Sequence, residues 1–209
     1  MKNLLWFIHI PKTGGSSINW FVNYTDKKLK RTRWECFAHD PYSQGRENEL
    51  RKKSGKLVSC TILRCPVEHS RSLYSYIRMR EDHNQHEMAR DHSFSEWIRK
   101  YSVLPNFYVN WWSREQGDLK QLPQFEPGPP GDVDKVIEIL SGIDYVLDTA
   151  TLRYGFNRVL RELGEEPRFN THKNKSPKIK VSDDDVRYIK KIRSEDYKLI
   201  KRFGIKEKF

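Results

Sequence analysis

Apolar residues gather in short continuous runs along the chain. LLWFIHI, from Leu4 to Ile10, is apolar at almost every position, and KLVSCTIL, from Lys56 to Leu63, is a second run of this kind. Such runs are typical of strands buried on both faces of a parallel sheet. WECFAH at 34–39 and the residues 144–147 are shorter candidates for two further strands.

Helical periodicity follows these runs. Ile18, Phe21 and Val22 share one face of a helix that we expect to begin near Ser16. Pro66 opens another helix, at a position where proline is tolerated. The remaining patterns predict helices at 44–53, 93–101, 133–140 and 151–163, and a final helical pair capped by Ser182. The segment 81–131 is less regular. Its aromatic stretch FYVNWW, at 107–112, fits the core better than a sugar-stacking surface.

Strands that alternate with helices predict an α/β fold. We expect a single P-loop-like domain over residues 1–209, with a central, mainly parallel sheet flanked by helices. In such sheets ligands bind beyond the carboxyl ends of the strands. The residues at those ends are therefore the candidates for function.

The composition indicates the kind of binding partner but does not identify it. The chain has 209 residues, of which 36% are hydrophobic, and a formal net charge of +11. The apolar fraction argues against disorder, and the charge indicates an anionic partner. An odd count of 3 cysteines and the lack of a membrane-length apolar run favour a reduced, cytoplasmic protein without a membrane partner.

The first candidate site follows the first run, where PKTGGSS occupies 11–17. Glycines that lead into a helix N-terminus let backbone amides surround an anion, and Lys12 adds a charge. The Walker pattern of nucleotide triphosphatases places lysine after the glycines, whereas here it precedes them. An ordinary turn remains an alternative for this stretch.

The second candidate follows the run 56–63, where LRCPVEHSRSLYSY begins at Leu63. Arg64 leaves the strand end, and Ser72 lies two helical turns later, so both can face one cleft and hold a second phosphate. A structural ion pair is the alternative role of Arg64. Metal-dependent phosphoryl transfer needs an acidic metal ligand at such a position, so arginine there favours a metal-free site.

Together the two stretches resemble the cofactor motifs of sulfotransferases that use 3′-phosphoadenosine 5′-phosphosulfate (PAPS). PKTGGSS is similar to their 5′-phosphosulfate loop. LRCPVEHSRSLYSY is similar to their 3′-phosphate motif, usually L-R-D-P-V-E-R-x-x-S-x-Y, with Cys65 and His69 as departures. The glycan O-sulfotransferases, whose loop reads P-K-T-G-G-[ST], resemble the chain most.

The resemblance implies roles for individual residues. Lys12 would stabilise the leaving group, and Arg64 and Ser72 would bind the 3′-phosphate. The 5′-phosphosulfate would be held by Thr13, Gly14, Gly15, Ser16 and Ser17. A basic stretch before the last helical pair resembles a loop that closes over the cofactor, and it contains Lys173, Asn174, Lys175 and Ser176. No metal is implied, and the product would be adenosine 3′,5′-bisphosphate (PAP).

Sulfuryl transfer to an alcohol needs a base, and histidine suits that role near neutral pH. His39 follows the predicted second strand, as the catalytic histidine does in several of the glycan sulfotransferases, and is our candidate. A loop-capping role beside Asp40 is the alternative. His9, inside the first strand, fits a core or supporting position.

The sequence thus predicts a sulfotransferase that acts on a hydroxyl acceptor, and specifically on a carbohydrate, which the positive charge suggests is an anionic glycan. Two alternatives remain. A nucleotide or small-molecule kinase with an atypical phosphate loop explains the first motif but lacks the acidic metal ligand. A non-catalytic polyanion-binding domain explains the charge alone. Nucleic acid is not an expected partner, because aromatic residues do not interleave with the basic runs.

Overall fold

The computed structural model describes residues 2–24, 32–35, 42–100, 104–113, 131–170 and 179–207. Its strands form one parallel sheet in the order β2-β1-β3-β4. Their bounds are Asn3–Ile8 (β1), Thr32–Glu35 (β2), Leu57–Leu63 (β3) and Tyr145–Asp148 (β4). The predicted α/β class with a parallel sheet flanked by helices is confirmed. β2 begins earlier than the run that predicted it.

Helices occupy most of the remaining described chain. Their bounds are Gly15–Tyr24 (α1), Gln44–Lys52 (α2), Pro66–Arg78 (α3), His86–Asp91 (α4), Phe94–Lys100 (α5), Phe107–Trp112 (α6), Val133–Ser141 (α7), Leu152–Glu162 (α8), Asp183–Ile192 (α9) and Ser194–Arg202 (α10). The aromatic stretch near 107 is a helix whose rings are buried, so its assignment to the core is correct. Within the described ranges no helix is long and apolar enough to cross a membrane.

The core lies on both faces of the sheet. Along β1, Leu4, Trp6 and Ile8 belong to one hydrophobic cluster, while Leu5 and Phe7 belong to another. Side chains alternate between the two faces of a strand. Both faces are covered, which explains why the run is apolar at consecutive positions rather than at alternate ones.

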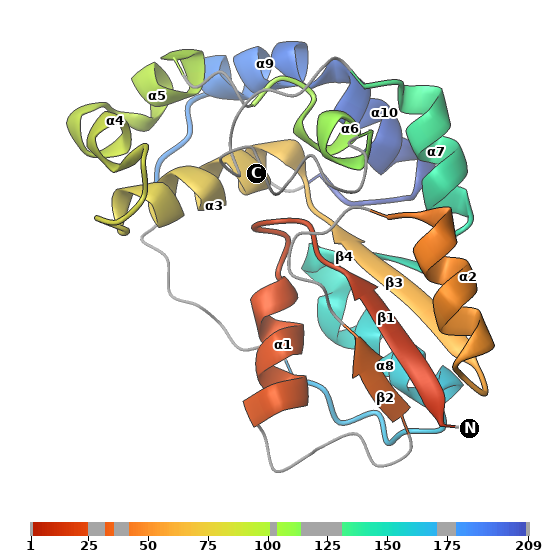
Figure 1. The fold of residues 1–209 in the computed structure, drawn as a ribbon. Helices are drawn as coiled ribbons and strands as arrows, with labels where there is room; N and C mark the ends of the chain where they lie inside the picture. Colours follow the sequence, from red (N-terminus) through yellow and green to blue (C-terminus); the bar gives the residue numbers. More distant parts are fainter. Residues whose placement is uncertain are drawn as a thin grey trace.

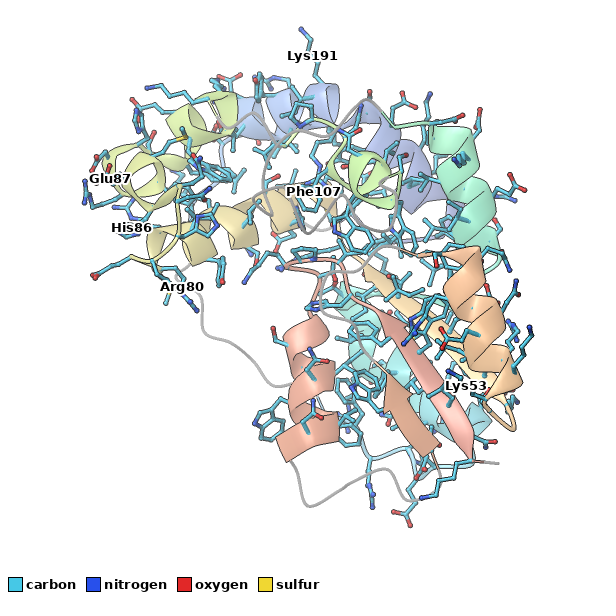
Figure 2. The ribbon with its side chains drawn as sticks, viewed as in Figure 1. Lys53, Arg80, His86, Glu87, Phe107 and Lys191 are labelled. Atoms are coloured by element: carbon cyan, nitrogen blue, oxygen red, sulfur yellow. The ribbon has the colours of Figure 1, made fainter. Side chains whose placement is uncertain are left out.

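The helices form two unequal groups around the sheet (Figure 1). Residues of α1 and α8 share the cluster of Leu5 and Phe7, so these helices cover one face. Figure 1 shows α3 to α6, α9 and α10 gathered beyond the carboxyl ends of the strands. In Figure 2, Phe107 lies inside this group, whereas Glu87 and Lys191 project outward from it. The helical group therefore stands directly over the strand ends where the candidate motifs lie.

Candidate anion-binding site

The two motifs leave neighbouring strands at the same edge of the sheet. β1 and β3 are paired in parallel, so the loop 11–17 and the turn into α3 begin side by side. The chain passes from β1 to β2 on one side and then crosses to β3 on the other. This reversal of strand order is a topological switch point, where parallel α/β sheets bind ligands.

The backbone of the first loop makes a tight turn into α1. Lys12 and Gly14 both adopt positive φ, at 62° and 104°. The hydroxyl of Thr13 is buried and donates to the carbonyl of Ile10 at 2.9 Å. The amide of Ser17 donates to the carbonyl of Gly14 at 3.0 Å. Because α1 starts directly after this turn, its first amides and the positive end of its dipole lie at the carboxyl edge of the sheet.

The two glycines of the loop are needed for different reasons. At Gly14 the positive φ disfavours any side chain, and a Cβ there would also approach Leu152 to 3.3 Å. At Gly15 the reason is packing, because a Cβ would lie 2.2 Å from Cδ2 of His9. His9 therefore sits behind the loop, which confirms the supporting position predicted for it.

Lys12 turns its side chain towards α3. Its Nζ lies 3.9 Å from the centroid of the Tyr76 ring, a cation–π contact. Burial, and then the positive charge of Arg64, lower the pKa of Lys12 to about 8. This lysine is poorly solvated, and within the described part of the chain it makes no ion pair with an acidic side chain. A bound anion would therefore stabilise its charged form.

Arg64 joins the two motifs. Its Nη1 donates to the backbone carbonyl of Lys12 at 3.2 Å, and its Nη2 lies 3.4 Å from the carboxylate of Glu68. Glu68 pairs more closely with Arg71, at 2.7 Å. The Arg64 side chain keeps 22% of its surface exposed. The long contact with Glu68 and this exposure leave Arg64 able to take a second anionic partner.

Ser72 lies on the same side of α3 as the residues that meet the loop. Residues four apart share one side of a helix, and Glu68, Ser72 and Tyr76 have this spacing. Glu68 contacts Arg64, and Tyr76 contacts Lys12, so Ser72 stands between two positions that face the first motif. Ser72 is partly exposed. Tyr76 packs against the hydrophobic core and also contacts Lys12, and the sequence carries no signal of the second contact.

A third strand end contributes a residue that sequence reasoning missed. The hydroxyl of Thr149, just after β4, lies 2.6 Å from the carbonyl of Thr13 and 3.0 Å from that of Leu63. One hydroxyl proton is shared between these two acceptors. Thr149 thus ties the first loop to the end of β3, and no local sequence pattern signals such a link.

Buried side chains hold both motifs from behind. His69 Nε2 lies 3.1 Å from the carbonyl of Pro11, and the hydroxyl of Tyr108 donates to the carbonyl of Arg64 at 2.9 Å. Both residues are fully buried. The sequence singled out His69 only as a departure from a motif, and Tyr108 only as part of an ambiguous aromatic run.

Several predicted site residues lie outside the described part of the chain. These are the candidate base His39 with its neighbour Asp40, and the basic stretch Lys173, Asn174, Lys175 and Ser176. Their roles stay predictions. The described residues Thr13, Gly14, Gly15, Ser16 and Ser17 are brought together with Lys12, Arg64 and Ser72 at one edge.

The groups at the described site are suited to holding an anion. Lys12, Arg64 and a helix N-terminus converge there, and the carboxylate of Glu68 is shared by two arginines. The acidic residue that ends β4, Asp148, already accepts from the amides of Ala150 and Lys206. In the described ranges no group of three or more histidine, cysteine or acidic residues could hold a metal ion.

No protein-family model matches this chain, and no curated protein matches its sequence.

Proposed function

We propose that this protein is a sulfotransferase that moves a sulfuryl group from PAPS to a hydroxyl acceptor, with an anionic carbohydrate as the proposed acceptor class. One observation carries the proposal. Arg64 of the second motif bonds the backbone of Lys12 in the first, and Lys12 rests on Tyr76, one turn beyond Ser72. Motifs separated by about fifty residues thus form one cationic site.

The residues present fit a nucleotide that carries anionic groups at both ends. Gly14 and Gly15 have no side chains to screen the first amides of α1, and a helix N-terminus of this kind binds phosphate groups. Arg64 and Ser72, on the second motif, would hold the 3′-phosphate. A second, separate phosphate distinguishes PAPS from ATP, and a second motif with its own arginine and hydroxyl would accept it.

Each residue then has a chemical role. PAPS supplies the sulfuryl group. His39 would take the proton of the acceptor hydroxyl as its oxygen forms a bond to sulfur. Lys12 and the amides at the start of α1 would neutralise the negative charge that grows on the bridging oxygen as the sulfur–oxygen bond to the 5′-phosphate breaks. PAP leaves with that electron pair, so atoms and charge balance without a metal.

The first test compares ligands by thermal unfolding. PAP at about a hundred times its dissociation constant should stabilise the protein by roughly 2.7 kcal/mol, whereas ADP with Mg²⁺ should stabilise it much less. Stabilisation by ADP and Mg²⁺ alone would overturn the proposal in favour of a kinase. A response to neither nucleotide, with retention on an anionic polysaccharide column, would favour the polyanion-binding domain instead.

A further inference from the structure

His69 makes two hydrogen bonds that define its protonation. Its Nδ1 lies 3.0 Å from Nη1 of Arg193, and its Nε2 lies 3.1 Å from the carbonyl of Pro11. Arginine can only donate, so Nδ1 accepts and the ring proton is on Nε2. His69 therefore donates to Pro11, the residue immediately before Lys12. Burial, and then the charge of Arg193, lower the pKa of His69 well below its usual value.

Arg193 is itself fixed inside the helical group. It is fully buried, and its Nε donates to Asp196, also fully buried, at 2.7 Å. Its Nη1 also lies 3.1 Å from the carbonyl of Pro66, the first residue of α3. The guanidinium packs 4.7 Å from the ring centroid of Tyr108. Because the guanidinium of Arg193 is fixed and can only donate, the His69 ring has a single orientation that satisfies both of its hydrogen bonds.

The same pair reaches the second motif. Oδ1 of Asp196 accepts from the amides of Tyr108 and Val109, at 2.9 Å and 3.0 Å, and so caps the start of α6. The Tyr108 hydroxyl then donates to the carbonyl of Arg64. Burial raises the pKa of Tyr108, so its phenol keeps the proton that it donates.

A buried ion pair is weak evidence of stability, because desolvation offsets much of the attraction. Here the pair leads along two routes to backbone carbonyls, those of Pro11 and Arg64, which flank the two cationic side chains of the site. We propose that Arg193 and Asp196, through His69 and Tyr108, are positioning residues that hold Lys12 and Arg64 in register for a bisphosphate ligand. This inference rests on the proposed function.

The decisive variants remove the links and leave the ligand contacts intact. His69→Phe keeps a ring and loses both hydrogen bonds, whereas His69→Gln retains a donor for Pro11. Tyr108→Phe removes one hydroxyl and is the milder variant should His69→Phe fail to fold. Tyr74→Phe is the matched control, because its hydroxyl also joins α3 to a backbone carbonyl, that of His92 at 2.7 Å, away from the loop.

Two readouts separate this inference from the function on which it rests. The first is amide hydrogen exchange over residues 7–21 without ligand, which reports local opening of the loop. His69→Phe should accelerate it, and Tyr74→Phe should not. The second is PAP affinity by calorimetry, expected to fall roughly tenfold in His69→Phe, the loss typical of a buried hydrogen bond, and to recover in His69→Gln.

Unchanged loop exchange and PAP affinity in a folded His69→Phe variant would overturn the positioning role. Equal acceleration of exchange in Tyr74→Phe would also overturn it, since the effect would then be general loosening of α3. A wild-type protein that binds no PAP would refute the proposed function. In that case a selective change in loop exchange would still support His69 and Arg193 as supports of the loop.

Discussion

Two sides of α3 differ in their exposure and in the residues that they contact. On one side, Ser72 and Tyr76 are partly exposed, and the Tyr76 ring makes a cation–π contact with Lys12 of the first loop. On a neighbouring side of the helix, His69 also meets the loop, at the carbonyl of Pro11, but it is fully buried and belongs to a chain of hydrogen bonds that ends at Asp196. One helix therefore carries, on different sides, the residues proposed to contact a ligand and the residues that support the loop. Substitutions on the exposed side should change activity alone, and those on the buried side should change stability as well.

The largest effect is expected on the buried side. Asp196→Ala removes the partner of Arg193 and the cap of α6, so we expect the free energy of unfolding to fall by about 3–5 kcal/mol. Urea denaturation measures this. Asp82→Ala, which breaks an exposed pair with Arg80, is the control and should change stability far less. Equal losses in both variants would mean that burial of the Arg193–Asp196 pair does not enlarge its effect on stability.

Lys12 contacts the partly exposed side of α3, and Lys12→Ala should lower turnover. Loss of one group that stabilises developing charge lowers the rate roughly 10²–10³-fold. The unfolding free energy should change by no more than about 1 kcal/mol, because the lost cation–π contact is worth about that much. Steady-state sulfuryl transfer from PAPS and urea denaturation measure the two quantities. Lys191→Ala, on the outer surface in Figure 2, should change neither. Full turnover in Lys12→Ala would remove Lys12 from the mechanism.

Gly15→Ala probes the loop between these extremes. The new Cβ would overlap the ring of His9, and relieving such overpacking costs about 1–3 kcal/mol. The shift should also weaken PAP binding. Gly45→Ala is the matched control, because nothing lies within 4 Å of its Cβ position in α2, and it should stabilise the protein by about 0.5 kcal/mol. Comparable stability of the two variants, measured by urea denaturation, would contradict the packing argument.

A smaller effect should appear with pH. Below pH 8 Lys12 is charged with and without ligand, so PAP affinity should be flat through this group. Above pH 8 the ligand-free lysine loses its proton and binding must restore it, so affinity should fall by up to about tenfold per pH unit. The free energy of unfolding should rise between pH 8 and 10, because the lysine of the unfolded chain still holds its proton there and that of the folded protein does not.

Calorimetry and urea denaturation across pH 7 to 10 follow both trends. Lys12→Arg keeps its charge throughout this range, so its PAP affinity should show no decline from this group. A decline of equal size in Lys12→Arg would assign the pH dependence to another residue.

The sequence was informative wherever the signal was local. The apolar runs located β1 and β3, and the parallel rule then brought Lys12 and Arg64 to one edge. It was weaker where helices are short, because α4 has 6 residues and carries little periodicity. β2 was placed too late, since its first residues are the polar Thr32 and Arg33.

The supports of the site could not be predicted from the sequence. Arg193 and His69 are 124 positions apart, and nothing in the local pattern of either marks the other as its partner. Tyr108 sits in an aromatic run that the sequence assigns to the core, and a core position does not reveal that its hydroxyl bonds the carbonyl of Arg64. Thr149 acts through backbone carbonyls, which every residue has, so its partners leave no trace in residue type.

Lys12 has a backbone conformation, φ of 62°, that most residues avoid and that glycine or asparagine adopts at lower cost. Folding alone therefore does not favour lysine at this position. In a library randomised at this codon, enrichment for folded protein should drift towards glycine and asparagine, while enrichment for bisphosphate capture should return lysine. The difference between the two populations would show how far the residue that best stabilises the fold differs from the residue that best binds the ligand at this position.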